Sequence, residues 1–549
     1  MEKRALLASA LALLILIAYQ FFFAPPPPRP KAERAEEVPA APPALVPEAA
    51  RPAPPRPPVA VRKPEREERI RLETDLLEVT LTNQGGTVLS WRIKRYTDEA
   101  GQPLDLAPPH EPGEPPISLA AWVEGGRGPD QLLEVVARPS GSPGQPQTVL
   151  FRAAEPGGLI LEKRLTLQPG KYQADIELRL LNRGAGATTP NLRVAWGPGF
   201  RGAAKPGAGP PGGQAIALVG GKRVTEDVTK LTEEAVHKGE ISWVAVQDSY
   251  FAAALVPVGG TPAAVIWKGA GERPVAALRF AGTALPGGAE RVQAVRFFGG
   301  PKEVERLSEL GHDLEQLVDL GWFGFLARPA LYLLKFLYRF TGNYGVVILL
   351  VTLLQKVAFL PLTLKSLKSM QAMQMLQPKV AAIRERHKNN RQKMNQETME
   401  LYKRHGVNPL GGCLPMVVQI PIFIALYNAL SSSVELWRAP FILWIDDLSA
   451  PDTLFVLPFT VPFLGEGFPF RVLPLLMGAS MFIQQKMTPT AGDPRQAQMM
   501  LYMMPTLFTF LFWGFPSGLV LYWLGSNVLQ IAHQYYMNRF SQKSPAAEA

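Results

Sequence analysis

Residues 345–366, GVVILLVTLLQKVAFLPLTLKS, form an apolar stretch long enough to cross a membrane, yet the stretch contains a lysine. Lys356 has Val, Leu, Ile, Ala and Phe as neighbours on both sides. A lysine at the centre of a spanning helix costs roughly 2.5 to 3.5 kcal/mol on insertion scales, and such residues usually face protein or water. The stretch therefore predicts a membrane helix whose internal charge, at Lys356, needs an explanation.

The composition divides the chain of 549 residues into a polar first half and an apolar second half. Its formal net charge of +10 favours an acidic partner, which could be nucleic acid, anionic lipid or an acidic polypeptide. Cys413 is the only cysteine, so no intrachain disulfide can form and any exported domain must be held by its own core.

The N-terminus predicts a membrane anchor followed by a tether. Residues 1–23 contain Lys3 and Arg4 and then an uncharged apolar run, typical of an uncleaved anchor with a cytoplasmic N-terminus; a cleaved signal peptide is the alternative. Residues 24–64 are rich in proline and cannot build a core, so we expect an extended linker.

Residues 65–300 show the pattern of a soluble all-β domain, a sandwich or a barrel. Stretches such as LLEVTLTN and ADIELRLLN alternate apolar and polar residues, with Gly, Pro and Asn between them. His110 and His237 lack the spacing of metal ligands, so a structural or docking role is favoured. The alternative is a membrane-anchored carbohydrate-active enzyme, which requires two carboxylates facing each other in a cleft.

The remaining residues predict helices, most of them in a membrane. Residues 301–340 mix aromatic and basic residues, as in an amphipathic helix at the membrane interface. Loop 365–410 is strongly basic and loop 431–470 is acidic, which places the first in the cytoplasm and the second outside. Together with the anchor this gives six spans, a short cytoplasmic loop (489–498) and a cytoplasmic tail (536–549); the five later spans are residues 341–364, 411–430, 471–488, 499–514 and 515–535.

The basic loop predicts a helical hairpin, with helices at 363–387 and 392–405 joined around KNNR. It carries methionines and basic residues that suit a dock for a ribosome or a nascent chain, while the alternative is a coiled hairpin with a solvated charged face. The candidate docking residues are Met370, Met373, Arg384, Arg386, Lys388 and Arg391.

Several long stretches closely resemble the conserved core of the bacterial YidC-type membrane protein insertases. They are LQPKVAAIRERH, VNPLGGCLPMVVQIPIFIALYNAL, SVELWRAPFILWIDDLSAPD, FIQQKMTPT and FPSGLVLYWLGSNVLQI, and the resemblance is continuous over about 322–540. The anchor and the large exported domain resemble the Gram-negative form, whose periplasmic domain is a β-supersandwich. The resemblance implies an α-helical membrane bundle of six spans, with a five-helix core and the cytoplasmic hairpin, in the cell inner membrane.

The resemblance also implies a catalyst of placement without covalent chemistry, cofactor or metal. Such insertases pass the polar tails of substrates through a hydrophilic groove open to the cytoplasm and to lipid, alone or with the Sec translocon. Most Gram-negative relatives have an arginine five residues before a proline in this groove; here Lys356 stands five residues before Pro361, so the charge is kept but bidentate recognition is not. The implied partners are nascent membrane proteins, the ribosome, the Sec translocon and lipids, with no nucleic acid beyond ribosomal contact.

The residues themselves predict the walls of this groove. Thr352 lies one turn before Lys356 and Gln355 is adjacent, while Tyr522, Ser526 and Gln530 form a polar stripe in the last span. The family's substrate-contacting aromatic pair matches Tyr522 and Trp523. The open alternatives are a Lys356 that snorkels to the interface, and Gln419, Asn428, Gln484 and Gln485 as bonds between helices. A small-solute transporter or channel is the rival function, although the sequence shows no internal repeat.

Overall fold

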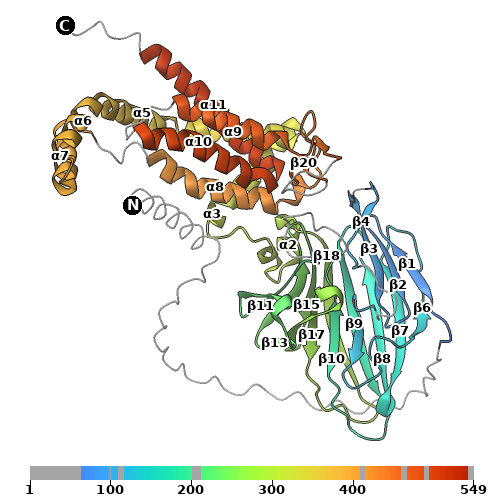
Figure 1. The fold of residues 1–549 in the computed structure, drawn as a ribbon. Helices are drawn as coiled ribbons and strands as arrows, with labels where there is room; N and C mark the ends of the chain where they lie inside the picture. The colour runs from blue at the N-terminus through green and yellow to red at the C-terminus, as the bar shows by residue number, and fades with distance from the viewer. Residues whose placement is uncertain are drawn as a thin grey trace, which may run out of the picture. The chain divides into compact units, whose positions relative to one another are not determined.

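A computed structural model describes residues 64–98, 100–108, 116–200, 212–407, 414–458, 467–487 and 494–541 (Figure 1). The predicted anchor, nearly all of the predicted linker, His110 and Cys413 lie outside the described residues, as do the side chains of Arg391 and residues 414–417, 494–497 and 538–541. The described chain is β-rich from Arg69 to Pro301 and mainly helical from Val304 onward, in agreement with the predicted fold class.

The largest sheet of the β-domain has nine antiparallel strands in the order β12-β11-β14-β15-β18-β9-β8-β7-β6 (Figure 1). Its central strands alternate buried and more exposed residues, which is the predicted period of two. The bounds are β6 Glu134–Ala137, β7 Gln147–Glu155, β8 Leu159–Leu167, β9 Gln173–Asn182, β11 Gln214–Val219, β12 Lys222–Glu226, β14 Ile241–Gln247, β15 Phe251–Val258 and β18 Glu290–Pro301.

Two further antiparallel sheets complete the β-domain. One has the order β1-β2-β3-β4, with bounds Arg69–Glu73, Leu77–Thr82, Val88–Thr97 and Pro103–Asp105. The other has the order β13-β16-β17-β10-β5, with bounds Ala235–His237, Ala263–Lys268, Pro274–Phe280, Leu192–Trp196 and Ala121–Val123.

The sheets share one core built around tryptophan. Strands β10 and β17 contact β11, β14 and β15, and the fully buried Trp91 and Trp196 both pack on Phe297, with ring centroids 4.9 and 4.7 Å apart. Trp91 donates its indole N–H to the carbonyl of Gly299 at 2.8 Å. A Cβ at position 299 would lie 2.8 Å from this indole nitrogen, so glycine there permits the close approach.

A buried lysine ties the three sheets together. Lys163 on β8 is 1% exposed, and its Nζ donates to the carbonyl of Gly86, 2.7 Å away, and to the carbonyl of Leu119. Gly86 precedes β3 and Leu119 precedes β5, so the contacts reach from the nine-stranded sheet into both others. Burial lowers the pKa of Lys163 to about 7, because the charged form loses its hydration.

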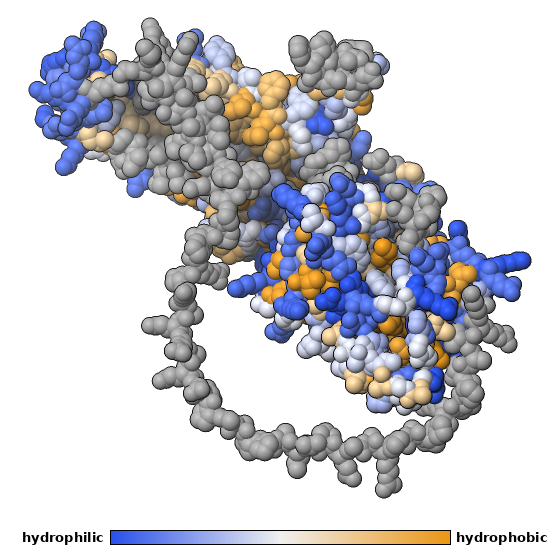
Figure 2. Space-filling model, turned by 60° about the horizontal axis from the view of Figure 1, so that its bottom comes forward, coloured by the Kyte–Doolittle hydropathy of each residue, from blue (hydrophilic) through white to orange (hydrophobic). Residues whose placement is uncertain are grey.

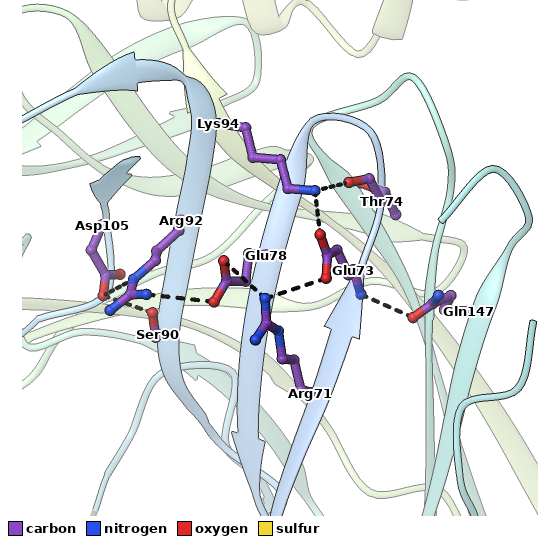
Figure 3. A network of polar contacts seen from close by, with 9 residues as sticks. All are labelled: Arg71, Glu73, Thr74, Glu78, Ser90, Arg92, Lys94, Asp105 and Gln147. Carbon is purple, nitrogen blue, oxygen red and sulfur yellow. Dashed lines mark hydrogen bonds and ion pairs between the residues drawn. The ribbon is translucent and has the colours of Figure 1, made fainter. Parts of the chain in front are cut away.

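The four-stranded sheet carries a ladder of cross-strand ion pairs (Figure 3). The acidic and basic groups alternate across it, in the pairs Arg71 with Glu73 and Glu78, Lys94 with Glu73, and Arg92 with Glu78 and Asp105. The hydrogen bond from Lys94 holds the pKa of Glu73 below its usual range. Because each carboxylate here faces a cation, we interpret the ladder as a stabilised, soluble sheet face and not as a pair of catalytic carboxylates.

The helical part begins with α2 (Val304–Leu310) and α3 (Gly324–Thr341). It continues through α4 (Tyr344–Ala358), α5 (Leu360–Met375), α6 (Gln377–Arg386), α7 (Arg391–Arg404), α8 (Leu414–Ser432), α9 (Val472–Met487), α10 (Pro494–Leu511) and α11 (Ser517–Ser541), with the short strands β19 (Phe455–Val456) and β20 (Pro469–Phe470) between α8 and α9. Helix α11 packs against α4, α8 and α9, and α10 packs against α9.

Two of the predicted helices are broken at prolines. The helix expected over 341–364 ends at Ala358, and α5 starts at Leu360 with Pro361 in its first turn. The helix expected over 363–387 likewise divides at Leu376, with Pro378 in the first turn of α6. A proline has no N–H for the helix ladder and disfavours helical backbone in the residue before it, which explains both breaks. Lys356 therefore lies in the last turn of α4, where a cation interacts favourably with the helix dipole.

Among the described helices, no single one has both the length and the hydropathy of a membrane span. Helices α4 and α5 together have both, with a bend of 60° at the break between them.

Candidate functional site

The predicted site residues meet where α4 contacts α11. The Lys356 Nζ donates to Gln530 Oε1 at 3.4 Å, and the Tyr522 hydroxyl donates to Gln355 Oε1 at 3.0 Å. Both contacts join polar residues of α4 to the predicted stripe of α11 across 167 or more positions of sequence. The structure thus brings together Lys356, Gln355, Tyr522 and Gln530.

A glycine and a third helix hold this contact in place. A Cβ at Gly525 would lie 2.8 Å from a methyl carbon of Leu349, so glycine lets α11 approach α4. Gln419 on α8 donates to the Tyr522 hydroxyl at 2.7 Å, and Tyr522 thereby links α4, α8 and α11. Asn428 of α8 donates to the carbonyl of Leu320, so this amide, like that of Gln419, makes a bond to another segment.

Thr352 faces α11 but does not present its hydroxyl there. The residue is fully buried, and its hydroxyl donates to the carbonyl of Ile348 one turn earlier at 2.6 Å. Such a bond within the helix is common for threonine in apolar surroundings. In this arrangement Thr352 contributes packing, and its role in a polar wall stays a prediction.

Trp523 points to a different neighbourhood from Tyr522. Its ring contacts Phe423 of α8, Phe508 of α10 and Phe512, with centroid distances of 4.7, 5.7 and 5.1 Å. The predicted aromatic pair is therefore divided: Tyr522 takes part in the polar contact with α4, and Trp523 belongs to an aromatic cluster. Ser526 is partly buried on the stripe between Tyr522 and Gln530.

Two buried polar atoms near this contact have no hydrogen-bond partner in the described part of the chain. They are Gln355 Nε2 on α4 and His533 Nε2 on α11. His533, which was not predicted, lies within electrostatic range of Lys356. The stripe of Tyr522, Ser526 and Gln530 could have revealed it, because position 533 is three helical turns beyond 522 on the same side.

Two other polar residues of α11, Asn527 and Gln534, face α9. Asn527 donates to the Ser480 hydroxyl at 3.0 Å, and Gln534 donates to the carbonyl of Met487 at 2.9 Å. These amides bond between helices, so the stripe toward α4 is the part of α11 with polar atoms left over.

The basic hairpin is only partly the surface that was predicted. Arg384, Arg386 and Lys388 are exposed, and the surface over α6 and α7 is strongly hydrophilic at the left of Figure 2. Met370 is half-buried and Met373 is 7% exposed, whereas Met375 is 75% exposed. Met373 therefore packs inside the structure and does not form part of a free docking surface.

Large apolar side chains are exposed on α10 and around α3. The residues with the most exposed rings are Trp322, Phe325 and Phe340 by α3, and Tyr502 and Phe510 on α10. Exposed aromatic and aliphatic patches of this kind are typical of surfaces that contact lipid or another protein.

Comparisons with known proteins cover both halves of the chain. The family described as the YidC periplasmic domain matches residues 69–333, and the family described as 60Kd inner membrane protein matches residues 336–544. A membrane protein insertase YidC of Syntrophus aciditrophicus is 36% identical over 98% of this chain and 100% of its own length. That of Pelobacter propionicus is 51% identical over 54% of each chain.

A crystal structure of an active YidC insertase with its first transmembrane domain resolved is 17% identical, covers 87% of this chain and 94% of its own, and has a TM-score of 0.37. The relative from Syntrophus aciditrophicus matches in identity and length across nearly the whole chain, and the two family matches follow one another along the chain, meeting within α3. The chain therefore belongs to the YidC family of membrane protein insertases.

Proposed function

We propose that this chain inserts newly made proteins into the inner membrane through a polar groove between α4 and α11, with Lys356 as its fixed positive charge. The observation that carries the proposal is the contact of Lys356 and Gln355 with Gln530 and Tyr522. Polar groups inside a membrane bundle must face protein or water, and here the groups on both helices face one another.

The unpartnered atoms support a wet groove. Buried polar atoms nearly always have a hydrogen-bond partner, so Gln355 Nε2 needs a water molecule or a substrate group. Water in this space lowers the cost of moving a polar tail out of the cytoplasm. An acidic residue of the tail pairs transiently with Lys356, which carries no ion pair in the described part of the chain.

The driving forces need no covalent chemistry, and the chain is an insertase and not an enzyme. The apolar segment of the substrate enters lipid along the open side of the groove, at about 25 cal/mol per Å² of apolar area removed from water. The membrane potential adds about 2.3 kcal/mol per elementary charge per 100 mV and favours outward movement of an acidic tail.

The topology follows from the charge pattern of the loops. We propose six spans. The bent pair α4 and α5 forms the second span and leads into the cytoplasmic hairpin, and α3 lies at the outer interface with its exposed aromatic rings. The basic surface of α6 and α7 suits contact with a ribosome that delivers the nascent chain, and the Sec translocon is the proposed partner for larger substrates.

Genetic complementation tests the groove. In cells depleted of their own insertase, Lys356→Arg should support growth, Lys356→Ala should support it poorly and Lys356→Glu should fail to support it. The glutamate of Lys356→Glu attracts cations and repels acidic tails. Lys365→Glu, a charge reversal at an exposed position of α5, is the matched control and should grow. If Lys356→Glu inserted single-span substrates with acidic tails as well as lysine does, the groove charge would have no role.

A further inference from the structure

We propose that His533 is a second charge-bearing residue of the groove and makes the insertion of acidic tails depend on cytoplasmic pH. This inference rests on the proposed function and extends it, because it assigns a substrate class, acidic tails, to a residue outside the predicted set.

The position of His533 follows from the helical repeat of α11. Tyr522, Ser526, Gln530 and His533 are spaced by four, four and three residues, so they form one stripe along the helix. The stripe contacts α4 at two of these positions, through Tyr522 to Gln355 and through Gln530 to Lys356. His533 is one turn beyond Gln530 and continues the stripe toward the end that we propose is cytoplasmic.

The imidazole has an atom that its surroundings leave unused. Its Nε2 is buried and has no hydrogen-bond partner among the described residues, whereas Gln534 next to it is bonded to Met487 on the other side of the helix. An imidazole nitrogen donates when it carries a proton and accepts when it does not. Neutral His533 can donate to an incoming carboxylate from this atom only as the Nε2–H tautomer, whereas the imidazolium always donates from it and adds a positive charge.

Among the described residues, the helices around His533 offer it no anionic partner. Helices α4, α8 and α9 pack on α11, and α10 reaches it through Phe508; the charged residues whose side chains are described on these four helices are Lys356 and Lys486. With respect to the described residues, the carboxylate of a substrate would thus be the only negative charge between Lys356 and His533.

Binding of an acidic tail and binding of a proton then reinforce each other. A carboxylate held by Lys356 stabilises the imidazolium of His533, and the imidazolium in turn adds a second charge-assisted hydrogen bond to the carboxylate. By linkage, acidic tails should be handled better as pH falls through the range in which histidine titrates, while neutral tails should show no such gain. The proton remains on His533 during transit and no bond is made or broken in the substrate.

The test is insertion by the full chain in proteoliposomes between about pH 6 and pH 8, where substrate carboxylates stay ionised. The probes are two single-span substrates that differ only in tail residues, Asp and Glu against Asn and Gln. For the wild type we expect the acidic-to-neutral ratio of insertion to rise about threefold or more from the higher to the lower pH. His533→Gln, which keeps a polar amide of similar size, should make the ratio flat, and His533→Lys should hold it high throughout.

His387→Gln is the matched control, because His387 pairs with Glu397 in the basic hairpin, 3.0 Å away, and lies outside the stripe. It should retain the wild-type profile. The proposal is overturned if His533→Gln keeps the wild-type pH dependence, or if neutral tails show the same dependence as acidic ones. Failure of the proposed function would look different, since the preference for acidic tails would then be absent at every pH and insensitive to Lys356.

Discussion

Lys163, which ties the three sheets of the β-domain together, should give this domain a stability that rises with pH. Its pKa is about 7 in the folded domain, against 10.5 for an ordinary lysine, because burial removes the charged form from water. Between these two values the unfolded chain binds more protons than the folded one. The free energy of unfolding therefore increases with pH over this window and falls as the pH drops toward 7.

The magnitude follows from the shift. One pKa unit corresponds to about 1.4 kcal/mol, so the full window is worth roughly 5 kcal/mol and the part between pH 7 and pH 9 about 2 kcal/mol. The perturbation is Lys163→Met, which keeps a flexible stem of similar length but cannot titrate. The variant loses its bonds to the carbonyls of Gly86 and Leu119, yet it also loses this source of pH dependence.

The assay is urea unfolding of the full chain in detergent, followed by tryptophan fluorescence, since Trp91, Trp196 and Trp243 are fully buried in this core. We expect the wild type to gain about 2 kcal/mol relative to Lys163→Met on going from pH 7 to pH 9. Parallel pH dependences for the two proteins would refute the reasoning, because they would show that Lys163 is charged in the folded domain as it is in the unfolded chain.

Two further predictions concern the helical part. Asp452 accepts hydrogen bonds from the backbone N–H groups of Val472 and Leu473 at the start of α9, each 2.9 Å long. Asp452→Ala should therefore cost about 1 to 2 kcal/mol of stability and lower the Tm in detergent, while Asp452→Asn should retain most of that stability. An equal loss of stability in both variants would contradict a capping role. Met373 is buried, whereas Met375 is exposed. Met373→Ala should therefore cost roughly 2 kcal/mol or more of stability and speed proteolysis of the basic hairpin, while Met375→Ala should leave the proteolysis rate unchanged. Faster proteolysis of Met375→Ala than of Met373→Ala would show that Met373 belongs to a free docking surface.

Local patterns explain what could be predicted. Alternation in the β-domain identified strands because the period of two is a property of each strand alone. The pairing of β1 to β18 into three sheets depends on contacts between distant residues, and no local pattern encodes it. The four-residue spacing of Tyr522, Ser526 and Gln530 indicated one polar side of α11, and two of these residues, Tyr522 and Gln530, contact α4. Their partners on α4 were identified from the family resemblance and from Lys356 as an unusual charge.

The failures have physical causes too. Hydropathy over 345–366 is continuous, whereas the backbone breaks before Pro361, because hydropathy does not register a missing N–H. Thr352 was expected to present a hydroxyl, but a threonine can satisfy this group on its own helix. Met373 and Met375 cannot be told apart by composition, since burial depends on which side of α5 meets the rest of the protein. His533 was missed because the spacing changes from four to three, although both spacings keep one side of a helix.

The most direct test of the central claim is an exchange of charge between groove and substrate. Purified wild-type protein and Lys356→Glu, each in proteoliposomes, would be given matched single-span substrates with acidic or basic tails. The account predicts that the wild type inserts the acidic tail in preference and that Lys356→Glu loses or reverses this preference while its fold, judged by Tm, is retained. An unchanged preference in a folded Lys356→Glu protein would contradict it, because the charge where α4 meets α11 would then have no part in choosing the substrate.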